Sequence, residues 1–528
     1  MRRPGGRGLV WAACAGVPFA ALSALLGARL LRGGWSAVAQ IVGTQGGLLL
    51  NTVVFGGLTA VVATALGWTV AHVQDSYAFP GRRMVGWVVL VPLVTPSFAC
   101  AMALVIVAGH NGWVTRWLWG GPDIYGLPGL VIAGAVARLP YAYLAMSVAY
   151  RLVDHAQVET AEALGASSRR VLTAVLWPRL RGAVVTVFLL VFADTVADLA
   201  NPLVIGGGYG VVASRLYQTV VGEADLAAAS GYAVLLFAPA LAYWLASGRS
   251  TLGPARLDVR PLAPRRTPGR VGRLLIGVAW VTAASIVGLL LVLVVEAFRP
   301  VGDAWTSAFA SVLTGVHTRA LATTVLLALV ALPVTTAVAV GGTLLLAPDA
   351  RLLRWGQRWC TVLGAVPNLV LGLAALLALV AMRGAFADGA SSRVLGVFWL
   401  IVLVHVLRNA PGMTHACLGA ADALVPDVRE SATLLGARGW RLARLVYLPR
   451  LRPVLRENAV MTFARMLTAT SSVILLADAQ VPLLTVSMLT EVSAGRLATA
   501  SAMTVTTGLL IGVAIALAQG GWRSVRTR

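Results

Sequence analysis

The chain has 528 residues, of which 58% are apolar and only 12% charged, and its mean hydropathy is +0.83. A soluble domain carries about 25% charged residues, so this chain lacks the polar surface that a soluble protein of its size needs. The composition predicts a polytopic membrane protein in contact with a lipid bilayer. The four cysteines stand singly without a CxxC spacing, so we expect neither disulfides nor a metal site.

The formal net charge of +22 comes from 42 basic residues, all of them arginine. Such a charge is compatible with nucleic-acid binding. Here the arginines fall in short segments between apolar runs, and the positive-inside rule accounts for that placement better. We therefore expect no nucleic-acid partner.

Apolar runs long enough to span a bilayer recur along the chain. A helix needs about 20 apolar residues to cross. The first run, at about 9–31, follows a basic start and is too long for a signal peptide, so it predicts an uncleaved first helix. Further spans are predicted at about 47–73, 84–108, 128–150, 183–205, 229–248, 274–297, 320–347, 359–383, 395–418, 457–477 and 498–520.

The stretch 249–273 interrupts this pattern with four prolines and seven arginines, a composition typical of a cytoplasmic linker. It leaves six predicted spans on either side. The expected fold is therefore an all-α polytopic membrane protein of about 12 helices. It consists of two tandem six-helix domains, residues 1–248 and 274–528.

Arginines lie mainly on one side of the predicted spans, and the opposite loops hold one or two each, such as Arg116, Arg215 and Arg496. By the positive-inside rule, the arginine-rich side and both termini are cytoplasmic. The arginines on that side are Arg82, Arg83, Arg169, Arg170, Arg179, Arg181, Arg351, Arg354, Arg358, Arg438, Arg441, Arg444, Arg450, Arg452, Arg456, Arg523, Arg526 and Arg528.

One arginine-bearing stretch occurs twice. Residues 159–178, ETAEALGASSRRVLTAVLWP, return 271 residues later as residues 430–449, ESATLLGARGWRLARLVYLP. We call these stretches the first and second elbow. Their shared residues are Glu159, Ala161, Leu164, Gly165, Ala166 and Pro178 in the first, and Glu430, Ala432, Leu435, Gly436, Ala437 and Pro449 in the second.

The same offset relates Pro140 to Pro411, Phe192 to Phe463 and LAAAS at 226–230 to LATAS at 497–501. The halves are therefore repeats in the same orientation, which predicts a pseudo-two-fold axis along the membrane normal and a pathway between the halves.

Each elbow is expected to be a short helix between two spans. Ala and Leu before the glycine favour helix, and Gly165 and Gly436 allow a bend or a close backbone approach. Pro178 and Pro449 stand where a new helix can start. The plain alternative is an ordinary basic loop, which identical spacing in two copies disfavours.

Both elbows resemble the EAA motif of bacterial ABC-importer permeases of the MetI-like type, with Thr160 and Ser431 at the second letter and Ala161 and Ala432 at the third. The resemblance implies a coupling helix that docks on an ATP-hydrolysing partner, through Glu159, Ala161, Gly165, Pro178, Glu430, Ala432, Gly436 and Pro449. It also implies two copies of that ATP-binding subunit, a solute-binding protein and the bacterial inner membrane. No cofactor is expected on this chain, and ATP–Mg would bind to the partner.

A fused pair of this kind resembles the iron(III)/thiamine/phosphonate permeases, and ADLANPLVIGG at 197–207 is similar to the iron(III) and aminoethylphosphonate members. The resemblance therefore implies iron(III) as cargo, with thiamine, aminoethylphosphonate or a polyamine as alternatives.

No catalytic residues are predicted. A P-loop needs a lysine to reach the phosphates, and this chain has none. HExxH, GxSxG and clustered Cys/His are also absent. The rivals are a gradient-driven secondary transporter, which would not need matched elbows, and a membrane-embedded transferase, which would need an acid or histidine cluster.

Charged residues inside a membrane are costly and usually functional. Asp194 and Asp198 are expected about one turn apart in one span, followed by Asn201, and the offset relates Asp194 to Arg465. We hypothesise that Asp194 and Arg465 pair or line the pathway, against a structural pair or a snorkelling Arg465. Arg138 and Arg408 are further pathway candidates, and His405 is favoured as a satisfied core residue. These groups are too few for a high-affinity metal cage.

Overall fold

In the computed structural model, nearly all ordered structure is helical. The described residues are 21, 24, 27–28, 35–117, 124–153, 155–167, 170–247, 268–300, 308–313, 316–347, 349–382, 390–423, 431–432, 434–436 and 440–525. Within them no strand occurs, and β structure is confined to isolated bridge residues, such as the pair Asp478 and Val481. The predicted all-α fold is confirmed.

Among the described residues, eight helices are long and apolar enough to cross a membrane. The number of spans rises to as many as ten if each of two bent helix pairs forms one span. The bent pairs are Arg82–Val94 with Ala99–Arg116, at 100°, and Arg351–Gly364 with Asn368–Ala381, at 82°. Two predicted spans have no counterpart among these helices. The predicted span 9–31 lies almost entirely outside the described residues. The predicted span 457–477 overlaps the end of α23 (Leu448–Leu467), which is too polar to count as a membrane span.

The helices group into two compact units that do not follow the chain's halves. The first-half unit comprises Gly46–Ser214 and Ala238–Glu296. The second-half unit comprises Ala297–Arg528, Arg215–Phe237 and the chain up to Gln45, as far as described. Two helices, α13 (Val212–Val221) and α14 (Leu226–Ser247), are divided between the units.

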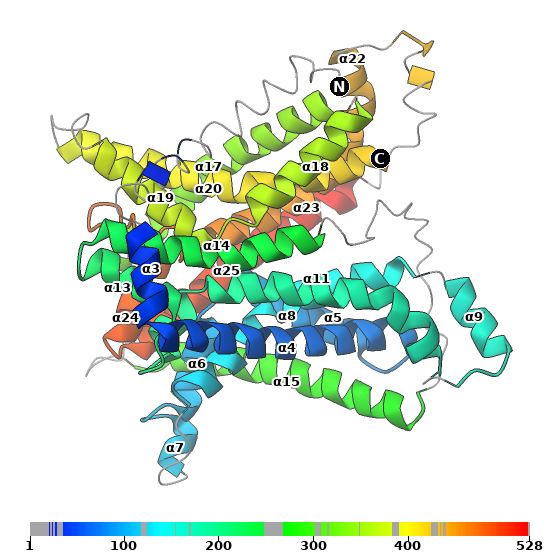
Figure 1. The fold of residues 1–528 in the computed structure, drawn as a ribbon, viewed down its shortest axis with the longest axis horizontal. Coiled ribbons are helices and arrows are strands. Elements are labelled where there is room, and N and C mark those ends of the chain that lie inside the picture. Colours follow the sequence, from blue (N-terminus) through cyan, green and yellow to red (C-terminus); the bar gives the residue numbers. More distant parts are fainter. Residues whose placement is uncertain are drawn as a thin grey trace. The chain divides into compact units, whose positions relative to one another are not determined.

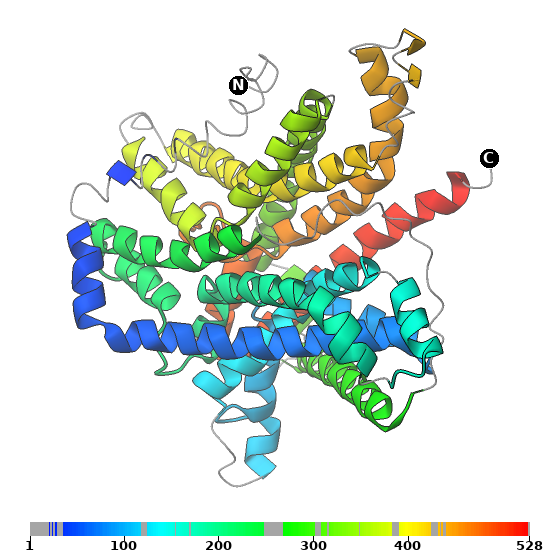
Figure 2. The ribbon, with the colours of Figure 1, turned by 45° about the vertical axis from the view of Figure 1, so that its right-hand side comes forward.

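In the first-half unit, α4, α8 and α11 lie side by side (Figure 1), and Ala60, Ala142 and Val187 belong to one buried cluster between them. α6 turns away from this bundle, with α7 beyond it (Figure 2). The elements are α4 (Gly46–Ser76), α5 (Arg82–Leu90), η3 (Val91–Val94), α6 (Ala99–Ala108), α7 (Trp113–Trp117), α8 (Leu127–Arg151), α9 (His155–Ala163), η4 (Val171–Leu176), α11 (Trp177–Val196), α12 (Ala200–Ile205) and α15 (Arg270–Ala297).

The helix α15 follows the predicted linker in sequence, yet it packs in the first-half unit. Its Ala279, Ala283 and Ile286 are buried in one cluster with Val70 of α4 and Val85 of α5. The domain limits 1–248 and 274–528 therefore describe the sequence repeat, whereas packing places α15 with the helices of the first half. The linker residues 249–267 lie outside the described residues.

In the second-half unit, α17, α18 and α20 pack around a cluster that includes Leu346, Cys360 and Leu418. The unit also includes α3, which packs against Gly231 of α14. Its elements are α3 (Trp35–Thr44), α16 (Ala308–Leu313), α17 (Val316–Leu346), α18 (Ala350–Gly364), α19 (Asn368–Ala381), α20 (Ala390–Asp422), α22 (Trp440–Leu442), η5 (Ala443–Tyr447), α23, α24 (Leu484–Ser493) and α25 (Leu497–Val525).

One buried contact occurs identically in both halves. The Oγ1 of Thr52 in α4 accepts a hydrogen bond from the backbone N–H of Val212, at 2.9 Å. The Oγ1 of Thr324 in α17 accepts one from the N–H of Leu484, also at 2.9 Å. Each threonine thereby satisfies the first amide of a short helix that has no intrahelical acceptor. The contact extends the internal repeat to residues that the elbow pattern does not include.

Candidate functional site: two matched elbows and a buried ion network

The first elbow is a helix with a left-handed ending. α9 ends at Ala163, Gly165 has φ +81°, and the N–H of Ala166 donates to the carbonyl of Ala161 at 3.0 Å. This bond from the residue after the glycine to a carbonyl five residues earlier is a Schellman ending, which favours glycine at the left-handed position. A π-helical turn, η4, then leads to α11, whose second residue is Pro178.

The second elbow repeats this geometry. Gly436 also has φ +81°, and the N–H of Leu435 donates to the carbonyl of Ser431 at 3.0 Å, as Leu164 donates to Thr160 in the first elbow. The π-helical turn η5 precedes α23, whose second residue is Pro449. Both elbows have a left-handed glycine followed by a π-helical turn. This shared geometry argues against the alternative that the elbows are ordinary loops.

The alanine of each elbow faces inward. Ala161 packs against the buried cluster of the first-half unit, which contains Tyr150 and Val158, and Ala432 packs against the cluster around Leu346. Both positions therefore need a small apolar side chain. Glu159 is exposed, and the second elbow's Glu430 and Ala437 lie outside the described residues.

Apolar side chains project from both elbows. Leu164 is 83% exposed, and Leu434 and Leu435 are 88% and 87% exposed. A β-carbon added at Gly165 or Gly436 would meet no atom within 4 Å, so the glycines serve the bend and not a close approach. Exposed leucines beside a rigid bend form a surface that a partner protein can cover.

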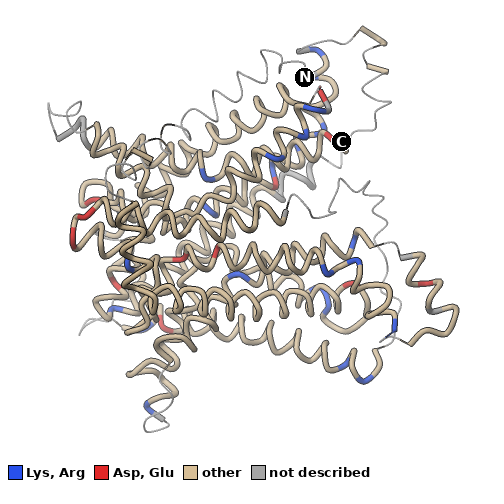
Figure 3. Tube along the Cα trace, in the orientation of Figure 1, with Lys and Arg blue, Asp and Glu red and all other residues tan. Residues whose placement is uncertain are grey.

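Arginines in the first-half unit gather at the end of the bundle that carries α9 (Figure 3). α9 lies beyond that end in both ribbon views (Figures 1 and 2). The helix termini there carry Arg151 of α8, Arg179 and Arg181 of α11, and Arg270 and Arg273 of α15. This asymmetry is the one that the positive-inside rule associates with the cytoplasmic side.

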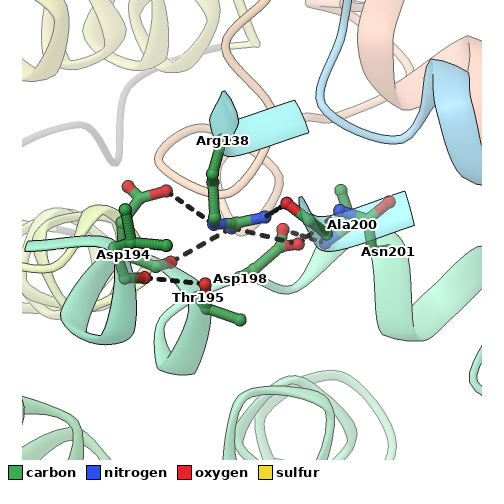
Figure 4. A network of polar contacts seen from close by, with 8 residues as sticks. Arg138, Asp194, Thr195, Asp198, Ala200 and Asn201 are labelled. Carbon is green, nitrogen blue, oxygen red and sulfur yellow. Dashed lines mark hydrogen bonds and ion pairs between the residues drawn. The ribbon is translucent and has the colours of Figure 1, made fainter. Parts of the chain in front are cut away.

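A buried ion network joins α8 to α11 (Figure 4). The Nε of Arg138 lies 3.0 Å from an oxygen of Asp194, and its Nη2 lies 3.3 Å from an oxygen of Asp198. The Arg138 and Asp198 side chains are 5% and 3% exposed, whereas that of Asp194 is 49% exposed. Asp198 also accepts from the N–H of Ala200 at 3.1 Å and from Nδ2 of Asn201 at 2.6 Å.

The structure corrects the expectation that Asp194 and Asp198 share a helix face. α11 ends at Val196, Asp198 lies in the break, and α12 begins at Ala200. The Asp198 carboxylate accepts a hydrogen bond from the first amide of α12, two residues along the chain, as in an Asx turn. The two carboxylates meet because both contact Arg138, not because of helical spacing.

The other pathway candidates lie in the second-half unit. Arg465 is exposed on α23 and Arg408 is half-buried on α20. The ion-pair partner that the structure gives Asp194 is Arg138, and the expected pairing with Arg465 stays a prediction. His405 is buried as expected, and its Nδ1 has no hydrogen-bond partner among the described residues.

Two features escaped sequence reasoning. The hydropathy of residues 183–205 predicts one continuous span and misses the break between α11 and α12, although Asn-Pro at 201–202 is a local signal for a turn. The π-helical turns carry no sequence signal that we can identify, and such turns often mark functional sites.

Comparison with known proteins agrees with this geometry. The family described as "Binding-protein-dependent transport system inner membrane component" matches the chain twice, at residues 63–247 and 337–521. The chain belongs to this family. It is a multi-pass inner-membrane permease component.

The chain is 25% identical over 472 residues to the putative ferric transport system permease protein FbpB 1 of Haemophilus influenzae, covering 82% of this chain and 70% of the relative. It is 25% identical over 485 residues to the ferric transport system permease protein FbpB of Actinobacillus pleuropneumoniae, covering 85% and 67%. The thiamine transport system permease protein ThiP of Haemophilus influenzae is 26% identical over 204 residues, covering 37% and 38%.

Proposed function

We propose that this chain is the permease subunit of an ABC importer that moves iron(III) across the bacterial inner membrane. The observation that carries the energy-coupling part is the pair of matched elbows, with left-handed Gly165 and Gly436, inward Ala161 and Ala432, and exposed leucines. Two equivalent docking surfaces imply two copies of an ATP-binding subunit. ATP–Mg binds to that subunit, and this chain carries no cofactor.

In this proposal a solute-binding protein delivers the cargo to the outer face, and both termini lie in the cytoplasm with the elbows. Closure of the ATP-binding subunits moves the elbows, and each elbow moves the two helices that flank it. In the first half these are α8 and α11, which share a buried cluster next to the elbow. A rigid connection at that point transmits force because packed interiors transmit strain.

Iron(III) is favoured over thiamine by the extent of the similarity. The relatives named as ferric permeases match over more than four-fifths of this chain, whereas the thiamine permease ThiP matches over 37% of it. Aminoethylphosphonate and polyamines have no comparable support.

The test is uptake of radioactive iron(III) into proteoliposomes that hold the chain, its ATP-binding subunit and its solute-binding protein. We expect uptake to need ATP and the binding protein together, and to stop with vanadate. Thiamine serves as the competing cargo. Uptake driven by a proton or sodium gradient without the ATP-binding subunit would overturn the proposal in favour of a secondary transporter.

A further inference from the structure

The Arg138–Asp194–Asp198 network has a surplus negative charge inside the membrane. Two carboxylates share one guanidinium, so the formal charges of −2 and +1 leave −1. Asp198 is buried and fully engaged, by Arg138, Ala200 and Asn201. The surplus therefore resides on Asp194, the one carboxylate of the network that is half exposed.

Arg138 lies near the middle of α8, which is long and apolar enough to cross a membrane. Arg138 is about 16 Å along α8 from Leu127 and about 20 Å from Arg151, at 1.5 Å rise per residue. A charged group exposed to lipid at that depth is strongly disfavoured, so intramembrane charges face the protein interior or a water-filled cavity. The exposed carboxylate of Asp194 thus indicates a water-accessible path at this depth.

Two further features favour a cation there. Asp194 lies in the last turn of α11, where the helix dipole places partial negative charge. Asn201 is fully buried, its Nδ2 binds Asp198, and its Oδ1 has no hydrogen-bond partner among the described residues. Both atoms belong to one planar carboxamide, so this oxygen lies beside the network. Buried carbonyl oxygens are normally hydrogen-bonded to protein or to ordered water, and this one has room in its bonding for such a partner.

We propose that this network is a cation-recognition site in the translocation pathway, resting on the proposed function as an importer. Asp194 contacts the cargo, Arg138 and Asp198 position it, and Asn201 holds the Asp198 carboxylate through its Nδ2. Carboxylate and carbonyl oxygens suit hard cations such as iron(III). One exposed carboxylate gives weak binding, and a pathway needs a site that the ion can leave.

The decisive variant is Asp194→Asn, which keeps the shape and can still accept a hydrogen bond from Arg138 while removing the surplus charge. Asp194→Glu keeps the charge, and Glu457→Gln removes an exposed carboxylate from α23 as a matched control. The purified chains in phosphatidylcholine nanodiscs are titrated with Tb³⁺, a hard trivalent probe followed by its luminescence. We expect about tenfold or weaker Tb³⁺ affinity for Asp194→Asn, with partial recovery in Asp194→Glu and none of this loss in Glu457→Gln.

The same variants are then assayed for ATP-driven iron(III) uptake in the reconstituted complex, where Asp194→Asn should slow uptake by about tenfold. Wild-type Tb³⁺ affinity or wild-type iron(III) uptake in correctly folded Asp194→Asn would overturn the site. If the wild-type chain moves no iron(III) but Tb³⁺ binding still depends on Asp194, the site stands and the proposed cargo is wrong.

Discussion

Arg138 of α8 and Asn409 of α20 occupy equivalent positions of the two halves, 271 residues apart, and their side chains differ in reach. Arg138 donates to the carbonyl of Gly134 at 3.4 Å and also bridges to two carboxylates. Asn409 donates only the corresponding bond, from Nδ2 to the carbonyl of His405 at 2.9 Å, among the bonds described. The local helix contact is repeated, whereas the uncharged Asn409 cannot form the ion pairs that Arg138 makes across to the next helix.

The helices that pack against α8 and α20, namely α11 and α23, also end in the same way but differ in their polar contacts. α11 and α23 are both 20 residues long, and they end at Val196 and Leu467, again 271 residues apart. The break after α11 contains Asp198, whose carboxylate accepts a hydrogen bond from the N–H of Ala200 at the start of α12. The equivalent residue in the second half is Ala469, whose carbonyl accepts a hydrogen bond from Thr485 Oγ1 at 2.7 Å. The break and the elbows are kept in both halves, as the proposed coupling to two ATP-binding subunits requires. The intramembrane charge differs between the halves, and the proposed cation site needs it only once.

The largest effect is expected from removing the guanidinium of the network. Arg138→Gln leaves the buried Asp198 without its counter-charge, and breaking a buried pair costs about 3–5 kcal/mol. Asn409→Ala at the equivalent position loses one hydrogen bond, at about 1 kcal/mol. Unfolding free energies of the purified chains in detergent measure both. Equal losses would show that the halves do not differ here.

The double variant Arg138→Gln with Asp198→Asn sharpens this test. It removes both buried charges of the pair, so it should recover a large part of the stability that Arg138→Gln loses. A double variant no more stable than Arg138→Gln alone would contradict the assignment of the loss to an unpaired Asp198.

The elbows should respond alike, in contrast to the network. Gly165→Val and Gly436→Val place a β-branched residue at φ +81°, where L-residues cost about 1–2 kcal/mol. The bend should distort while the chain still inserts, so ATP hydrolysis continues and uptake per ATP falls. The controls are Gly182→Ala in α11 and Gly412→Ala in α20, where an added β-carbon also meets nothing within 4 Å. Normal coupling in the double valine variant would count against docking at the elbows.

The paired threonines should also behave alike. Thr52→Val and Thr324→Val keep the side-chain volume but leave the buried amides of Val212 and Leu484 without an acceptor. An unsatisfied buried amide costs about 1–3 kcal/mol. Thermal unfolding should show comparable losses in the two halves. A clear loss in one variant only would show that the repeated contact does not carry repeated stability.

The sequence predicts the repeat and the elbows well, because the duplication preserves the turn chemistry that fixes local structure. Leu-Gly-Ala predicts a bend at Gly165 and Gly436, and both adopt the left-handed conformation. The packing of α15 is not predictable in this way. A span that is apolar all round can bury against many partners, so its pattern does not select one. The pairing of Arg138 with Asp194 and Asp198 likewise depends on where α11 breaks, which hydropathy does not register.

The smallest expected effect concerns the loops after α13 and α24, where the halves place opposite charges on the short helix. Arg215 of α13 pairs with Glu223 at 2.7 Å, and Glu491 of α24 accepts two hydrogen bonds from Arg496. The hydrogen bonds from Arg496 hold the pKa of Glu491 below its usual range, against the opposing effect of its burial.

Because the folded-state pKa is lowered, this pair stabilises the fold above the ordinary glutamate pKa of about 4.3, and the contribution is lost as the pH falls through the lower folded-state value. Glu491→Gln should therefore cost about 1 kcal/mol or less at neutral pH and nothing once the pH is below both values. Unfolding of wild type and variant from neutral to acidic pH measures the difference, with Glu223→Gln as the matched variant in the other half. A Glu491→Gln loss that persists unchanged in acid would show that packing of this side chain, and not its charge, stabilises the loop.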